Sequence, residues 1–343
     1  MMRLFLAALA SALFTQAAPA ADAPGIEREI ERAIGQSLQG DAAAAVRSLT
    51  AVPSASVTGE NAELRKCMLE RFAASSQAPA VPGTGDAWMD SLATAYQSYW
   101  HHALSHPDQV LAADNALRAK VATVLGRRLE SGDALDAAEA DLEKRALEHG
   151  FHVLLGRTPP LREFMAWKTT VVESRPVALP DGPEVVRVNL LQDFVLRGWG
   201  HFATCGQRSA GGWANDDGLF AVVPAYRSVT DETFNVRFVA HEGQHYADKR
   251  RFKNLEPWEL EYRGKLAEFA LADESQQSTR QLICENQGNS KESAHGYANT
   301  QVVRVVSERL KQDPAAFCHD MALPGQALRD AARTLLLEDT AKR

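Results

Sequence analysis

A stripe of aromatic and histidine side chains in the second half of the chain constrains its fold more than any other feature. Phe234, Phe238, His241 and His245 follow one another at intervals of three or four residues. This is the spacing of side chains on one face of an α-helix. Histidines one turn apart on such a face can direct their ring nitrogens at a single point. The sequence therefore predicts a helix that presents both histidines together.

Glu242 stands between these histidines, in the segment His241-Glu242-Gly243-Gln244-His245. This is the HExxH pattern, whose two histidines supply two of the ligands that a zinc ion needs. The carboxylate beside the first histidine can accept a proton from a zinc-bound water as that water attacks a carbonyl group. The pattern predicts one Zn²⁺ per chain, with Glu242 as the general base. The alternative is a helix with two histidines at the edge of the core and a solvated glutamate.

A third protein ligand has to come from another segment. The motif HExxHxxGxxH would place a glycine and a third histidine where Asp248 and Arg251 stand, so that class of site is excluded. A second helix is predicted shortly afterwards, because Pro257 is typical of a first helical turn. This helix carries several glutamates.

Glu261 is the ligand that we favour on this second helix, because the missing side chain of Gly264 would let the helix approach its neighbour closely. Glu259 and Glu268 are the alternatives. Both Glu259 and Glu261 can instead form an ion pair with a basic residue four positions further on.

The segment from about Leu219 to Leu271 resembles the gluzincin group of zinc metallopeptidases, which includes the thermolysin-like enzymes. The resemblance implies a zincin-like domain in which His241, His245 and Glu261 bind zinc. The chain departs from the group at Lys265, where an aspartate is expected to orient the histidines. Asp248 is a candidate for this orienting role, and a surface position is the alternative.

The resemblance also implies an antiparallel edge strand before the motif helix, against which a peptide substrate lies extended. The segment Leu219–Tyr226 is in the right place for this strand, and Pro224 is tolerated at a sheet edge. An edge strand binds the main chain of a peptide. We therefore expect the substrate to contact four consecutive residues, Leu219, Phe220, Ala221 and Val222. An ordinary sheet strand is the alternative.

Peptide hydrolysis also needs a donor for the negative charge that develops on the attacked carbonyl oxygen. His295 and Tyr297 lie in a polar segment downstream of the zinc ligands, where gluzincins carry such donors. They are the candidates for this role, and hydrogen bonding to the backbone is the alternative.

The rest of the chain predicts a mainly helical α+β protein. Apolar residues at helical spacing predict helices over 26–34, 61–74, 88–106, 134–149 and, shorter, 161–168. Runs rich in Val, Leu and Phe predict strands over 185–191, 194–199 and 219–226. We expect a helical N-terminal region at 21–157, then a zincin-like domain at 158–343 with a small mixed or antiparallel sheet and the HExxH helix.

The first twenty residues have the pattern of a secretory signal peptide. Arg3 is followed by the apolar run Leu4–Phe14 and by Ala18-Pro19-Ala20. The apolar run is too short to span a bilayer, so we expect no integral membrane segment in the mature chain. Removal of residues 1–20 would leave an exported protein, periplasmic or secreted.

Four cysteines in an exported protein predict disulfide bonds. Cys67, Cys205, Cys284 and Cys318 allow three pairings. We favour Cys284 with Cys318, because both fall in the C-terminal helical part. Free buried thiols are the alternative.

The net charge of −7 argues against nucleic acid as a partner. The sequence favours an exported zinc peptidase that acts on peptides or proteins. One alternative is a periplasmic scaffolding or binding protein that holds zinc without proteolysis. Another is a helical interaction module in which the motif arose by chance.

Overall fold

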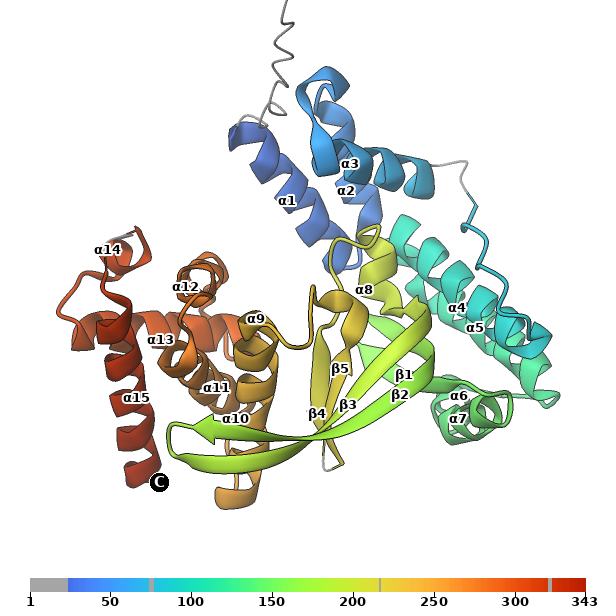
Figure 1. The fold of residues 1–343 in the computed structure, drawn as a ribbon. Helices are drawn as coiled ribbons and strands as arrows, with labels where there is room; N and C mark the ends of the chain where they lie inside the picture. Colours follow the sequence, from blue (N-terminus) through green and yellow to red (C-terminus); the bar gives the residue numbers. More distant parts are fainter. Residues whose placement is uncertain (1–23, 74–76, 216, 320–322) are drawn as a thin grey trace, which may run out of the picture.

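The computed structural model describes residues 24–73, 77–215, 217–319 and 323–343. Within these ranges the protein is mainly helical and has one mixed five-stranded sheet, which confirms the predicted α+β class. Figure 1 shows the sheet in the middle, with helices α4–α7 on the right, α9–α15 on the left and α1–α3 above. The predicted signal peptide lies outside the described residues. Among the described helices, none has the length and apolar character needed to cross a bilayer.

The N-terminal helices pack in two groups, α1–α3 and α4–α7, with a separate hydrophobic core for each. They are α1 (Pro24–Leu38), α2 (Ala42–Ala51), α3 (Gly59–Phe72), α4 (Ala87–Ser105), α5 (Val110–Leu125), α6 (Gly132–Asp136) and α7 (Glu139–Glu148), with the 3₁₀ turns η1 (Ser54–Ser56) and η2 (Pro107–Gln109). The helices predicted in this region are confirmed, except that a break divides the last one into α6 and α7. The start of α4 is capped by Asp86, whose side chain accepts a hydrogen bond from the Met89 backbone N–H at 2.8 Å.

The sheet is built around one long hairpin. Its strands are β1 (His152–Thr158), β2 (Leu161–Leu179), β3 (Gly182–Arg197), β4 (Gly212–Asn215) and β5 (Gly218–Val222), in the order β1-β2-β3-β5-β4. All neighbouring strands are antiparallel except β3 and β5, which are parallel. The β2–β3 hairpin extends far beyond the other strands, and its tip reaches the C-terminal helix α15 (Figure 1).

Two predictions about this region are wrong. The segment 161–168 is the first part of β2 and not a helix, because it pairs with β1 on one side and β3 on the other and is buried on both faces for most of its length. The strand β1 is not among the predicted strands, and it pairs with β2 across the domain boundary predicted at 157/158. The helices α4–α7 share one hydrophobic core with this part of the sheet, through Leu161 and Phe164 of β2, whereas most of α1–α3 packs around a core of its own.

The expected edge strand is also wrong. β5 carries Leu219–Val222, and it lies between β3 and β4, so its main chain already pairs on both sides. β4, which precedes β5 in the chain and runs antiparallel to it, is the edge strand of the sheet. The backbone then leaves the sheet at Val223–Ala225, a 3₁₀ turn (η3) that contains Pro224.

The second half of the chain is helical again. Its elements are α8 (Gly198–Ala203), α9 (Glu232–Phe234), η4 (Asn235–Ala240, a π-helix), α10 (His241–Arg251), α11 (Pro257–Leu271), α12 (Gln276–Glu285), α13 (Ala294–Arg309), α14 (Pro314–His319) and α15 (Gly325–Lys342). The predicted motif helix is confirmed as the run α9-η4-α10. Phe234 and Phe238 anchor this run on the sheet, where they share a core with Val188, Leu219 and Ala221.

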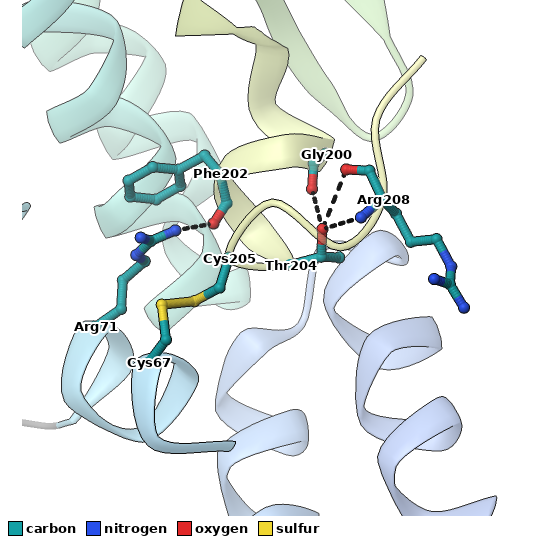
Figure 2. The surroundings of a disulfide bond; sticks show 7 residues. All are labelled: Cys67, Arg71, Gly200, Phe202, Thr204, Cys205 and Arg208. Carbon is teal, nitrogen blue, oxygen red and sulfur yellow. Dashed lines mark hydrogen bonds between the residues drawn. A yellow bond between two sulfur atoms is a disulfide. The ribbon is translucent and has the colours of Figure 1, made fainter. Parts of the chain in front are cut away.

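Two disulfides join segments that lie far apart in sequence. Cys284 pairs with Cys318, as predicted, and Cys67 pairs with Cys205. Figure 2 shows that the second bond ties α3 to the turn after α8, where Arg71 also donates to the Phe202 carbonyl oxygen. In the same turn the Thr204 hydroxyl donates to the Gly200 carbonyl oxygen at 2.8 Å. Two such bonds are typical of proteins from an oxidising compartment.

Candidate metal centre

Three side chains from two helices converge at one point. His241 and His245 lie one turn apart on α10, and both are buried. Nε2 of His241 lies 3.3 Å from one carboxylate oxygen of Glu261, and Nε2 of His245 lies 4.0 Å from the other. The ligand atoms of these three residues all lie within 4.8 Å of one another. The residues predicted to bind metal are therefore brought together.

The donor set fits a zinc ion. Zinc-to-ligand distances of 2.0–2.2 Å in a tetrahedron separate the ligand atoms by about 3.3–3.6 Å, close to the separations found between the histidines and Glu261. Nε2 of His245 is buried and has no hydrogen-bond partner among the described residues. Buried polar atoms without a partner are rare in native proteins, and a bound ion would supply the partner that this nitrogen lacks. Two imidazoles and one carboxylate form a set that can hold a metal ion and leave one position open.

Gly264 makes this approach possible. A Cβ atom at this position would lie 2.8 Å from Cε1 of His241 and 2.9 Å from Nε2 of His245. Real Cβ atoms essentially never come so close to other heavy atoms. The expectation that a missing side chain lets α11 pack closely against its neighbour is confirmed.

His241 is oriented by Glu268 and not by Asp248. Nδ1 of His241 lies 2.6 Å from a carboxylate oxygen of Glu268, which is also buried. Glu268 stands two turns beyond Glu261, and Lys265 lies 3.6 Å from the same oxygen. The suggested role of Asp248 is wrong, because its carboxylate binds Arg263 and Gln244 instead.

The alternative ligand Glu259 points elsewhere. Its carboxylate accepts a hydrogen bond from the Glu256 backbone N–H at 2.8 Å and pairs with Arg343 at 2.9 Å. The ion pair suggested between Glu259 and Arg263 is not formed, because the Arg263 guanidinium binds aspartates from other segments. The lysine four positions after Glu261 has its ammonium group beside the carboxylate of Glu268 instead.

The carboxylates control the charge of this site. Burial alone would lower the pKa of His241, but hydrogen bonds to Glu261 and Glu268 outweigh burial and raise the pKa to about 10. Burial opposes ionisation of Glu261, but its contacts with His241 and His295 hold its pKa well below the usual range. The pKa of Glu242 is lowered as well, because the nearby histidines outweigh its burial. The site therefore holds ionised carboxylates around one point, an arrangement that favours a cation.

Glu242 and His295 lie beside the three donors. A carboxylate oxygen of Glu242 is 3.4 Å from Nδ1 of His245. His295 lies in the first turn of α13, and its Nδ1 is 2.7 Å from a carboxylate oxygen of Glu261 while the rest of its side chain is exposed. Tyr297 is different, since its ring packs edge-on against Trp258 at 5.1 Å. Of the two predicted donors, His295 contacts a metal donor directly, and Tyr297 contacts Trp258 on α11.

Tyr226 is a residue at this site that the sequence did not indicate. Its ring packs against Phe234 and Phe238, with centroid distances of 4.8 and 5.8 Å. Burial, and then the charge of Glu242, raise the pKa of Tyr226, so its hydroxyl group remains protonated and can donate. That hydroxyl makes no hydrogen bond with any residue in the described ranges. The sequence held no local signal, because Tyr226 follows a turn.

The edge strand β4 begins next to the motif helix. A Cβ atom at Gly211 would lie 2.6 Å from the Tyr226 hydroxyl oxygen, and one at Gly212 would lie 2.5 Å from the Phe238 ring. Phe238 precedes Glu242 by one helical turn. A peptide that paired with the free edge of β4 would therefore pass beside the helix that carries Glu242.

Comparisons with models of protein families, with curated proteins and with solved structures found nothing that matches this chain. What the site can do therefore follows from its own geometry.

Proposed function

We propose that this protein is an exported zinc-dependent peptidase. One observation carries the proposal: two buried histidines and Glu261 converge on one point, with a second carboxylate, Glu242, beside them. Three protein ligands with one open position are typical of catalytic zinc sites, whereas structural sites have four. A glutamate next to an open zinc position is the arrangement that peptide hydrolysis requires.

His241, His245 and Glu261 would hold the zinc ion. When bound, zinc polarises a carbonyl group and lowers the pKa of water at the open position. Glu242 is ionised near neutral pH, as a general base has to be, since its pKa is lowered. Its carboxylate accepts the proton of the attacking water and then delivers this proton to the leaving amine, so that the base is regenerated with each turnover.

The remaining roles concern the substrate. In this proposal the peptide main chain pairs with the free edge of β4 and extends the sheet by one strand. Tyr226 and His295 donate hydrogen bonds to the oxygen of the attacked carbonyl group, on which negative charge develops. Main-chain pairing depends little on the side chains of the substrate, so we expect a broad range of peptides to be accepted.

Export is the second part of the proposal. It is supported by the two disulfides, which persist in oxidising compartments, and by the signal-peptide pattern of residues 1–20. Together they favour a periplasmic or secreted protein.

One contact favours a different function. Nδ1 of His295 lies beside the three donors, at a hydrogen-bond distance of 2.7 Å from a carboxylate oxygen of Glu261. If His295 bound the metal too, the site would be closed and structural. The protein would then be a zinc-binding scaffolding or binding protein without proteolytic activity.

Elemental analysis of the purified mature protein tests the proposal, combined with a library of fluorogenic peptides. We expect about one zinc per chain in the wild type and in Glu242→Gln, and none in His241→Ala. Glu259→Gln is the matched control for Glu261→Gln, because both change a glutamate of α11 and only the second should lose zinc. Turnover should disappear in Glu242→Gln while zinc is retained. A wild type that takes up no zinc on reconstitution would overturn the proposal, and zinc without turnover would favour the scaffolding function.

A further inference from the structure

A buried arginine lies next to the candidate metal centre, on the helix that carries Glu261. Arg263 stands between Glu261 and Gly264 on α11, and its side chain is fully buried. Its guanidinium contacts three carboxylates, one from each of three other segments. These are Asp248 of α10, Asp181 at the tip of the β2–β3 hairpin and Asp339 of α15. We refer to these four residues as the Arg263 cluster.

The contacts within the Arg263 cluster have well-defined geometry. Arg263 binds Asp248 through two parallel hydrogen bonds, from Nε at 2.7 Å and from Nη2 at 2.9 Å. Nη2 also lies 2.9 Å from Asp181, and Nη1 lies 2.6 Å from Asp339. The side chains of Asp181 and Asp248 are almost completely inaccessible to solvent. Bidentate contacts between arginine and carboxylate are both strong and directional, so they fix the position of the groups they join.

The Arg263 cluster connects the two helices that supply the metal donors. Asp248 follows His245 by three residues on α10, and Arg263 follows Glu261 by two on α11. Gln244, inside the HExxH segment, donates its amide to Asp248 at 2.9 Å and to Asp181 at 3.2 Å. The network therefore fixes α10 against α11 immediately beside the ligands.

The metal centre needs its ligands to be held in precise positions. The helices meet where Gly264 leaves no space for even a methyl group, and metal-ligand distances tolerate errors of only about 0.2 Å. A small shift of α11 would move Glu261 away from the two histidines. Residues that orient metal ligands typically contribute 10- to 100-fold to metal affinity.

We propose that Asp181 and Arg263 are positioning residues, through which the tip of the β2–β3 hairpin holds the three metal donors in register. The hairpin spans the molecule from the N-terminal helices to α15 (Figure 1), so it couples the distant half of the sheet to the metal centre. The C-terminal helix takes part through Asp339 and through Thr340, whose hydroxyl accepts a hydrogen bond from Arg263 at 3.0 Å. This inference rests on the proposed zinc site.

Zinc affinity of the full-length mature protein, measured by competition with a chromogenic chelator, tests the inference. We expect Asp181→Asn to weaken zinc binding at least tenfold. Glu184→Gln is the matched control, because Glu184 lies at the same hairpin tip and shares its partner Arg251 with Asp181 but does not contact Arg263. Its zinc affinity should stay within twofold of the wild type.

A second measurement separates positioning from general stability. The visible absorption of the cobalt-substituted protein reports ligand geometry, and we expect it to change in Asp181→Asn and to stay the same in Glu184→Gln. If Asp181→Asn does not fold, Thr340→Val removes an uncharged hydroxyl that accepts from Arg263 and donates to Asp181, and it should still weaken zinc binding. Equal zinc affinity and equal spectra in the wild type and in a folded variant would overturn the inference. Failure of the wild type to bind zinc would instead overturn the proposed function.

Discussion

Glu268 lies 2.6 Å from Nδ1 of His241, and both side chains are buried. A hydrogen bond to one ring nitrogen fixes which nitrogen is left for a metal. Here Nδ1 is engaged, so Nε2 points towards Glu261. The Lys265 ammonium, 3.6 Å from the same carboxylate, balances part of its buried charge.

We expect Glu268→Ala to weaken zinc binding by about 10- to 100-fold, because the imidazole of His241 loses the partner that orients it. Glu268→Gln keeps a hydrogen-bonding group and should fall between Glu268→Ala and the wild type. Chelator competition measures the effect. Unchanged zinc affinity in Glu268→Ala would show that the contact with His241 is not needed for metal binding.

Gly264→Ala should lose zinc almost completely, because the added methyl group would overlap both imidazoles. Gly243→Ala is the matched control, since Gly243 lies inside the HExxH segment but the nearest neighbours of an added Cβ would be Val186 and Val177, at 3.6 and 3.8 Å. These are ordinary packing distances. Zinc content by elemental analysis should distinguish the two variants, and equal zinc content in both would contradict the proposed close approach at Gly264.

Local periodicity was enough to predict the ligand-bearing helices. His241 and His245 are one turn apart, so helical spacing alone places them on one face. The role of Gly264 could be read in the same way, because a residue without a side chain indicates close approach wherever two helices meet. The pairing of Cys284 with Cys318 could be predicted because both cysteines lie in one compact helical region.

The features that depend on contacts between segments far apart in the sequence could not be predicted. A strand has the same residue pattern at the edge of a sheet as in its interior. The residues Leu219–Val222 therefore gave no sign that β4 would pair with β5 and take the edge position. The segment 161–168 is buried on both faces, and such a run lacks the alternation that distinguishes strands from helices. Glu268, one turn beyond the position of the expected aspartate, takes its place because the docking of α11 on α10 brings it to His241.

The two disulfides should contribute unequally to stability. Cys67 and Cys205 are separated by 138 residues, and Cys284 and Cys318 by 34. Loop-closure entropy gives about 5 kcal/mol for the longer loop and about 4 kcal/mol for the shorter. We therefore expect the double variant Cys67→Ser/Cys205→Ser to lose about 1 kcal/mol more in the free energy of unfolding than Cys284→Ser/Cys318→Ser. Urea denaturation of both variants measures this difference, and the opposite order would show that local packing dominates over chain entropy.

Tyr226→Phe should lower kcat without removing zinc. The ring would still pack against Phe234 and Phe238, so the fold should be preserved, and only the hydroxyl group at the start of β4 is lost. Removal of one donor to a developing oxyanion typically costs on the order of 10²-fold in kcat, with little effect on KM. Tyr262→Phe removes an equivalent hydroxyl from a half-buried tyrosine that packs in the C-terminal core, and it should leave kcat unchanged. Equal kcat values for Tyr226→Phe and the wild type would exclude this hydroxyl from the reaction and leave His295 as the remaining candidate donor.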